Sequence, residues 1–134
     1  MTEYILDTDT CIYWLKGKGE IHRKVEQVGT DHLKTTMITL AELKYGAYHS
    51  QQVNENLKNI DNFLIKVEVL PLSEEAADLF GKIKTDLRRS GQMIEDFDIL
   101  IASITLTYGG ILVTNNVDHF KKIGGLNYES WLEQ

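Results

Sequence analysis

The segment Tyr4-Ile5-Leu6-Asp7-Thr8-Asp9-Thr10 opens the chain with a short apolar run that ends at a carboxylate. A continuous apolar run of this kind is typical of a strand buried on both faces of a parallel sheet. Helical patterning follows at once, so the sequence predicts a strand that leads directly into a helix. Asp7 then stands at the carboxyl end of a strand, where open parallel sheets bind their ligands.

The same alternation continues to the end of the chain. Further strands are predicted at Thr36–Ile38, Val67–Leu70, Ile111–Val113 and near Leu126–Tyr128. Helices are predicted at Thr10–Lys16, Glu20–Val28, Leu40–His49, Val53–Ile65, Glu74–Arg89 and Phe97–Thr107. This order predicts a single three-layer α/β/α domain over residues 1–134, with a mainly parallel central sheet.

The composition is that of an ordinary globular protein, with 43% hydrophobic and 25% charged residues among 134. The N-terminal segment has neither the basic start nor the apolar stretch of a secretory signal, and no later run approaches the roughly 18 apolar residues of a membrane span. The single cysteine, Cys11, cannot form an intramolecular disulfide. We therefore expect a cytoplasmic protein without a membrane segment.

The net charge of −6 disfavours long-range attraction to nucleic acid. It does not exclude a nuclease, because a site that gathers carboxylates around a cation carries negative charge by necessity, and the bound cation inverts the local field. The net charge alone therefore neither supports nor excludes a nuclease.

Two carboxylates lie near the carboxyl ends of the first two predicted strands. Asp7 follows the first strand, although it or Asp9 would also serve as the N-cap of the next helix. Glu42 lies in the helix after the second strand, where Thr39-Leu40-Ala41-Glu42 has the pattern of a capping box. Both residues face the same predicted sheet edge, which makes them candidates for one site.

A third carboxylate group opens the apolar helix near residue 97. Glu95, Asp96 and Asp98 place three carboxylates within four residues, and such crowding is costly unless a cation offsets the repulsion between the negative charges. The alternative is that Asp96 caps the helix, Glu95 is solvated and Asp98 complements the helix dipole. Asp98 directly precedes a buried apolar run, so it is the one expected to point inward.

The strand predicted at Ile111–Val113 ends in small polar residues. Thr114 and Asn116 could supply neutral oxygens to a hydrated metal or to a phosphate, whereas Asn115 or Asn116 could simply cap the next helix. The histidines at positions 22, 32, 49 and 119 show no spacing typical of a metal site and are interpreted as surface or structural residues. An all-oxygen donor set favours Mg²⁺ or Mn²⁺ over zinc and suits phosphodiester hydrolysis.

Four motifs together resemble a known family. They are Leu6–Ile12, Ile38–Leu43 with Gly46, Asp98–Ala102, and Val113–Asn116 with Phe120. In order and spacing they resemble PIN-domain proteins, and more narrowly the VapC ribonuclease toxins of VapBC toxin-antitoxin pairs. The resemblance spans nearly the whole chain.

The resemblance implies roles for particular residues. Asp7 and Asp98 correspond to the principal Mg²⁺ ligands of the family, and Glu42 to the acidic residue that completes the cluster. Asn116 stands where relatives carry Asn or Asp. Asp9 replaces a residue that is usually Asn, and Asp96 adds a carboxylate that many members lack, so either is a candidate supplementary ligand.

The resemblance also implies a substrate and partners. The expected activity is metal-dependent endonucleolytic cleavage of RNA, in many relatives transfer RNA, which leaves a 5′-phosphate and a 3′-hydroxyl. The expected partners are a VapB-type antitoxin that blocks the site and a second copy of the chain in a homodimer. Basic residues must hold the RNA backbone, and the candidates are Lys82, Lys84, Arg88 and Arg89, although these equally describe a solvated helix face.

Two other functions are compatible with the sequence. Asp7-Thr8-Asp9 after a buried strand resembles the start of haloacid-dehalogenase-like phosphatases, in which Asp7 would be the nucleophile, but the acidic pair near Asp98 precedes Thr114, contrary to that family's order. A non-catalytic module that uses an acidic groove to bind a basic partner is the second alternative. Metal-dependent turnover distinguishes the ribonuclease from such a module.

Overall fold

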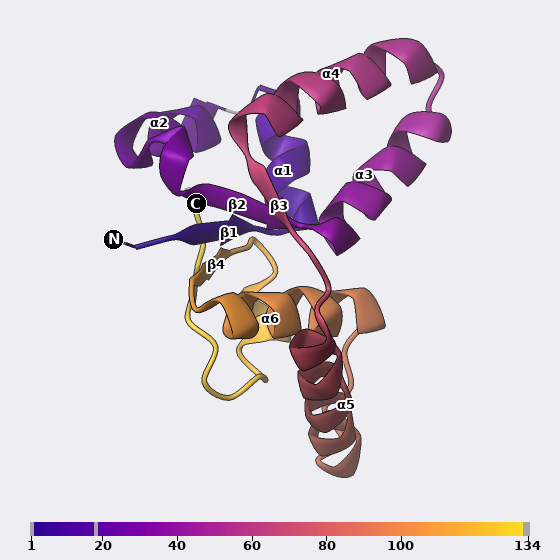
Figure 1. Cartoon of the computed structure of the whole chain (residues 1–134), viewed down its shortest axis with the longest axis vertical. Helices are drawn as coiled ribbons and strands as arrows, with labels where there is room; N and C mark the ends of the chain where they lie inside the picture. The colour runs from indigo at the N-terminus through magenta and orange to yellow at the C-terminus, as the bar shows by residue number, and fades with distance from the viewer. Residues whose placement is uncertain (1, 18, 133–134) are drawn as a thin grey trace.

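The computed structural model describes residues 2–17 and 19–132, and its centre is a sheet in which every paired strand runs parallel (Figure 1). The strands are β1 (Tyr4–Leu6), β2 (Leu33–Thr36), β3 (Glu68–Leu70), β4 (Ile111–Val113) and β5 (Tyr128–Glu129). Their order across the sheet is β3-β2-β1-β4-β5. The chain therefore builds outward from β1 in one direction and then returns to its other side, and the order of strands reverses between β1 and β4.

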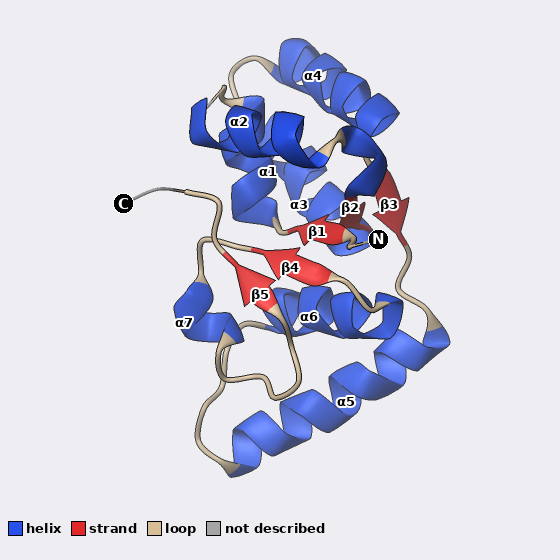
Figure 2. Cartoon of the chain, turned by 90° about the vertical axis from the view of Figure 1, so that its left-hand side faces the viewer, coloured by secondary structure: helices blue, strands red, loops and turns tan. Residues whose placement is uncertain are grey.

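Helices cover both faces of this sheet (Figure 2). They are α1 (Thr8–Leu15), α2 (Gly19–Val28), α3 (Met37–Tyr48), α4 (Val53–Lys66), α5 (Glu74–Arg89), α6 (Asp96–Tyr108) and α7 (Val117–Phe120), with a 3-10 turn at Thr30–His32. The first four lie over one face, and α5, α6 and α7 lie over the other. The predicted three-layer α/β fold is confirmed.

The two faces of the central strands belong to separate hydrophobic cores. Ile5 and Leu112 point into the core beneath α5, α6 and α7, whereas Leu6 and Val113 point into the core beneath α1 to α4. All four side chains are fully buried. Successive side chains of a strand point to opposite faces, so an uninterrupted apolar run is what a strand with a core on each side requires.

The second strand lies earlier in the chain than predicted. Thr36–Ile38 was expected to be a strand, but β2 ends at Thr36 and α3 begins at Met37. The Thr36 hydroxyl accepts a hydrogen bond from Thr39 N–H at 3.1 Å and so acts as the N-cap of α3. The capping box expected between Thr39 and Glu42 is therefore also wrong, and Glu42 lies well inside the helix.

The last strand is displaced in the same way. The expected strand Leu126–Tyr128 lies at Tyr128–Glu129 instead. Leu126 is a core residue beneath α5, α6 and α7, so its hydrophobicity reflects loop packing and not strand pairing. Periodicity cannot separate these two causes over so few residues.

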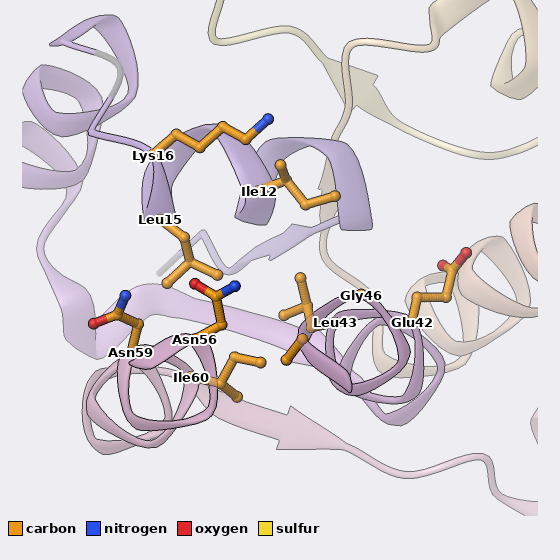
Figure 3. A pocket seen from close by; sticks show the side chains of 10 residues that line it. Ile12, Leu15, Lys16, Glu42, Leu43, Gly46, Asn56, Asn59 and Ile60 are labelled. Atoms are coloured by element: carbon orange, nitrogen blue, oxygen red, sulfur yellow. The ribbon is translucent and has the colours of Figure 1, made fainter. Parts of the chain in front are cut away.

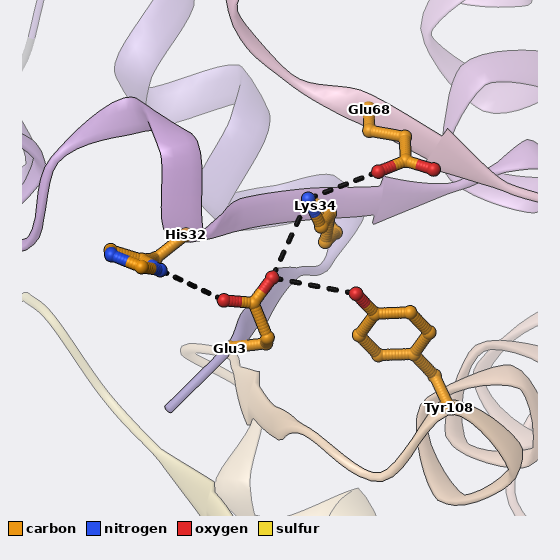
Figure 4. A network of polar contacts seen from close by, with 5 residues as sticks. All are labelled: Glu3, His32, Lys34, Glu68 and Tyr108. Atoms are coloured by element: carbon orange, nitrogen blue, oxygen red, sulfur yellow. Dashed lines mark hydrogen bonds and ion pairs between the residues drawn. The ribbon is translucent and has the colours of Figure 1, made fainter. Parts of the chain in front are cut away.

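A polar network at the amino end of the sheet joins the residue before β1 to β2, β3 and the end of α6 (Figure 4). Glu3 contacts His32 Nδ1 at 2.9 Å, Lys34 Nζ at 3.4 Å and the Tyr108 hydroxyl at 3.4 Å, and Lys34 also pairs with Glu68 at 3.0 Å. The hydrogen bond with His32 is the main reason that the pKa of Glu3 lies below its ordinary value. The carboxylates of Glu3 and Glu68 at this edge are therefore each paired with a basic side chain.

Gly110 lies where α6 turns into β4, and it allows two backbone segments to approach closely. A Cβ atom at this position would lie 2.3 Å from Ile5 Cδ1 and 2.8 Å from the carbonyl oxygen of Glu3. The backbone oxygen cannot move without disturbing the β1–β4 pairing, since Ile111 N–H donates to it at 2.9 Å.

We expect Gly110→Ala to lower the free energy of unfolding by about 1–3 kcal/mol through overpacking, measured by urea denaturation in EDTA. Gly124→Ala is the matched control, because Gly124 has no atom within 4 Å of its Cβ position and no positive φ. Its effect should stay within about 0.5 kcal/mol. Equal free energies of unfolding in the two variants would show that the close approach at Gly110 does not contribute to stability.

Candidate active site

Polar side chains gather at the carboxyl ends of β1 and β4, where the order of the strands reverses. Asp7 N–H donates to Val113 C=O at 3.0 Å, and the Thr10 hydroxyl donates to the same carbonyl at 3.1 Å. These bonds fix the start of α1 against the end of β4. Ligands of open parallel sheets bind at such a reversal point.

Asp7 is a buried carboxylate, with only 4% of its surface exposed. Its Oδ1 accepts the Thr10 N–H at 2.9 Å, so Asp7 is also the N-cap of α1. Burial raises its pKa to about 6, against the opposing effect of hydrogen bonds from Thr114 and Thr10. No ion pair joins Asp7 to a cationic side chain in the described part of the chain. The capping hydrogen bond is to Oδ1.

Glu42 reaches the same edge from α3 and is half-buried. The Thr8 hydroxyl donates to its Oε1 at 2.5 Å and also lies 3.2 Å from the Thr39 hydroxyl. Burial is the main cause of the raised pKa of Glu42, and the negative charges of Asp98 and Asp9 raise it further. The carboxylate of Glu42 thus lies in the electrostatic field of the acidic group at the start of α6.

Asp98 lies in the first turn of α6, and its Oδ2 is 2.7 Å from Nδ1 of His119. The side chain of Asn116 contacts the same Nδ1 at 2.8 Å, and the Asn116 backbone N–H donates to the Thr114 hydroxyl at 2.9 Å. These contacts join Asp98 to the end of β4, where the Thr114 side chain lies close enough to Asp7 to lower the pKa of its carboxyl group.

Asp96 and Asp9 are less closely joined to this group. Both oxygens of Asp96 contact Lys84 Nζ, at 2.9 and 3.1 Å, so its carboxylate is tied to α5. The N-cap position of α6 belongs to Glu95, whose side chain makes no capping hydrogen bond, and not to Asp96. Asp9 is an exposed residue in the first turn of α1.

The basic residues proposed for RNA binding differ in their surroundings. Lys84 is occupied by Asp96, and Lys82 pairs with Asp78 at 3.2 Å. Arg88 and Arg89 are exposed at the end of α5 and form no ion pair within the described residues.

The sequence missed two residues that touch the carboxylates, Thr8 and His119. Thr8 stands between two acidic residues, and that position was its only signal. His119 was interpreted as a surface or structural residue because no second histidine lies at metal-site spacing, and its one signal was that it follows the strand end at Thr114–Asn116. Both contacts join segments far apart in the chain, 34 residues for Thr8 with Glu42 and 21 for His119 with Asp98.

The donor set suits a hydrated divalent cation. Across residues 2–17 and 19–132, no three His, Cys, Asp or Glu side chains are close enough together to hold a metal ion directly. Mg²⁺ does not require this, because it keeps several waters and takes one or two carboxylates directly. A buried carboxylate without a cationic partner, close to further negative charges, is the environment that such an ion stabilises.

A groove of about 360 Å³ lies beside this edge, between α1, α3 and α4 (Figure 3). Its walls include Ile12, Leu15, Leu43 and Ile60, and Glu42 lines it as well. The groove is mainly apolar and contains neither Asp7 nor Asp98, so it is a surface adjoining the carboxylates and not the place where they meet.

In the described residues, no helix is long and apolar enough to cross a membrane.

Comparisons with known proteins all match this chain to members of the same family. The model of the PIN domain matches residues 4–126. The tRNA(fMet)-specific endonuclease VapC of Shigella flexneri is 36% identical over 98% of this chain and 99% of the relative. Ribonuclease VapC2 of Rickettsia felis is 33% identical over 96% of this chain and 97% of the relative.

Solved structures agree with these matches. A chain of VapBC2 from Rickettsia felis, bound to a DNA fragment from their promoter, superposes with a TM-score of 0.92 at 31% identity, over 98% of this chain and 100% of that one. A chain of DNA-bound VapBC from Salmonella typhimurium gives the same TM-score at 34% identity and the same coverage.

The raised pKa of Asp7 predicts how stability depends on pH without metal. The folded pKa is about 6 against an ordinary value of 3.8, so the unfolded chain loses this proton first as the pH rises. Stability therefore falls between about pH 4 and pH 6, and the loss, on the order of 3 kcal/mol, persists above pH 6.

In EDTA at pH 8, Asp7→Asn should therefore unfold at a higher urea concentration than the wild type, and the difference should close as the pH falls to 4. Mg²⁺ should stabilise the wild type more than the variant. Asp31→Asn, at an exposed position, is the control and should follow the wild type throughout. A wild type as stable as Asp7→Asn at pH 8 in EDTA would contradict the argument.

Proposed function

The chain belongs to the PIN-domain family and, within it, to the VapC ribonucleases, and we propose from this premise that it cleaves transfer RNA. The observation that carries the proposal is the buried carboxylate of Asp7 at the strand reversal point, which pairs with no basic side chain among the described residues, together with full-length similarity to a tRNA(fMet)-specific endonuclease. The enzyme depends on a divalent metal ion, as PIN-domain nucleases do, and we propose Mg²⁺, with Mn²⁺ also compatible with the oxygen donors.

We propose that Asp7, Glu42 and Asp98 hold this ion, with one or two of them as direct ligands and the rest through its bound waters. When bound, it would polarise water for in-line attack on phosphorus and offset the charge that develops on the phosphate oxygens. The residues around these carboxylates hold them in place: Thr8 donates to Glu42, and the Thr10 N–H fixes one oxygen of Asp7.

The supporting residues have unequal roles in this proposal. We propose that Thr114 and Asn116 order the site, since Asn116 contacts the His119 ring that contacts Asp98, and Thr114 accepts the Asn116 N–H beside Asp7. Asp9 contributes negative charge near Glu42. Asp96 remains a candidate supplementary ligand only if it releases Lys84, because that lysine contacts both of its oxygens.

The toxin-antitoxin relatives suggest the partners. We propose that a VapB-type antitoxin neutralises the enzyme, and that toxin and antitoxin assemble as a hetero-oligomer built on a toxin homodimer. Because Glu42 lines the apolar groove between α1, α3 and α4, an antitoxin segment that filled the groove would cover this carboxylate. We also propose a cytoplasmic location, because that is where a transfer RNA substrate would be met. We further propose that residues 1–134 act as one domain.

The alternatives fit the site less well. A phosphatase would need Asp7 as a nucleophile, yet Asp7 is buried and one of its oxygens is occupied by capping. A docking module would bind a basic partner without turnover. The similarity to ribonucleases over nearly the whole chain favours catalysis over both.

We expect antitoxin-free protein to cut tRNA in Mg²⁺ into discrete fragments with 5′-phosphate and 3′-hydroxyl ends, and to lose this activity in EDTA. Asp7→Asn and Asp98→Asn should each lower the rate at least about 100-fold, because several kcal/mol of charge stabilisation depends on the ion that they hold. Fragment sequencing and end analysis give the site of cleavage and its chemistry.

Asp118→Asn is the control, because the side chain of this aspartate is 84% exposed and, among the described residues, its ion pair is with Lys121. It should cleave at the wild-type rate. Fragments that persist in EDTA and in both active-site variants would indicate a contaminating nuclease. No cleavage of any RNA by folded wild type would overturn the proposal and favour the docking module.

A further inference from the structure

His119 is held against the acidic site by two contacts. It lies on α7, just after the end of β4, and its Nδ1 is 2.7 Å from Asp98 Oδ2 on α6 and 2.8 Å from the side chain of Asn116. The His119 side chain is 35% exposed and that of Asp98 22%. The ring therefore approaches Asp98 from a separate element that packs against α6, and not from the same helix.

The contact with Asp98 fixes which ring nitrogen carries a proton. An ionised carboxylate only accepts hydrogen bonds, so Nδ1 must donate to Asp98 Oδ2. An amide nitrogen of Asn116 cannot donate to the same protonated Nδ1. The amide oxygen and nitrogen exchange places by a 180° rotation, and the oxygen is the atom that fits next to the Nδ1 proton. The Nδ1–H of His119 is thus shared between Asp98 Oδ2 and the amide oxygen of Asn116.

Asp98 is not used to cap its own helix. The N-cap of α6 is Glu95, and within the described residues the recorded hydrogen bond of the Asp98 carboxylate is the one to His119. That bond occupies Oδ2 and leaves Oδ1 for a cation. A carboxylate held at one oxygen presents the other in a fixed direction, and partners that orient ligands in this way typically change metal affinity by 10- to 100-fold.

We propose that His119 is a positioning residue of the metal site, which orients Asp98 through its Nδ1–H. The inference rests on the proposed role of Asp98 as a metal ligand. It differs from a surface ion pair in a testable respect: an exposed pair contributes at most about 1 kcal/mol to stability and has no effect on metal affinity.

Two substitutions separate the ring nitrogens. The amide nitrogen of Asn lies where Nδ1 lies in His, one bond beyond Cγ, whereas that of Gln lies near the position of Nε2. His119→Asn thus keeps the donor to Asp98, and His119→Gln and His119→Ala remove it. His22→Ala is the control, because His22 is exposed on α2.

The measurement is Mn²⁺ binding to the purified full chain, by electron paramagnetic resonance of free Mn²⁺, with the urea midpoint in EDTA as a test of folding. We expect His119→Ala and His119→Gln to weaken Mn²⁺ binding about 10-fold, and His119→Asn to stay within about threefold of the wild type. The Mg²⁺ concentration for half-maximal tRNA cleavage should rise in the same order, and saturating Mg²⁺ should recover most of the rate.

The other outcomes overturn the inference. Equal Mn²⁺ affinity in all variants would make His119 a surface residue, and weak binding by His119→Asn would exclude Nδ1–H donation. Retained activity in His119→Gln with loss in His119→Asn would assign the role to Nε2 instead. If the folded wild type binds no Mn²⁺ and Asp98→Asn changes nothing, the metal site itself is wrong, which is a separate failure from that of His119.

Discussion

The backbone hydrogen bond from Asp7 N–H to Val113 C=O holds together the two strands between which the sheet reverses. It sets the end of β1 level with the end of β4 and fixes the direction in which α1 leaves the sheet. The side chain of Asp7 is buried at this junction as a consequence. The segments that carry Thr8 and Thr114 are brought close together by the same pairing, so the site depends on it.

The site is organised at a cost to stability. Asp7 and Glu42 both have raised pKa values, for which burial is the first cause and neighbouring negative charge adds to it. The amino edge of the sheet shows the contrast, since Glu3 is paired there with His32 and Lys34 and its pKa is lowered. Functional sites commonly carry such uncompensated charge, and a bound cation or substrate recovers the lost energy.

The side chains around the carboxylates come from separate elements. Thr8 on α1 holds Glu42 on α3, and His119 on α7 holds Asp98 on α6. Each bond joins two helices that pack against one another, so the orientation of a carboxylate depends on the placement of a helix that does not carry it. Substitutions in the packing between these helices would then alter the site without touching it.

The sequence by itself determined the layered fold and the identity of Asp7, Glu42 and Asp98 as candidates. An apolar run followed by a carboxylate is a local pattern, and burial on both faces leaves strands such as Tyr4–Leu6 and Ile111–Val113 little other choice. The start of α3 was misplaced because Thr36 and Thr39 are both good N-caps, and only the strand register at Thr36 selects between them. Tertiary structure alone decided that Glu42 is bound by Thr8 and that Asp98 is bound by His119. The physical reason is that hydrogen bonds between residues 21 and 34 positions apart leave no periodic mark in the sequence and form only when the sheet brings their helices together.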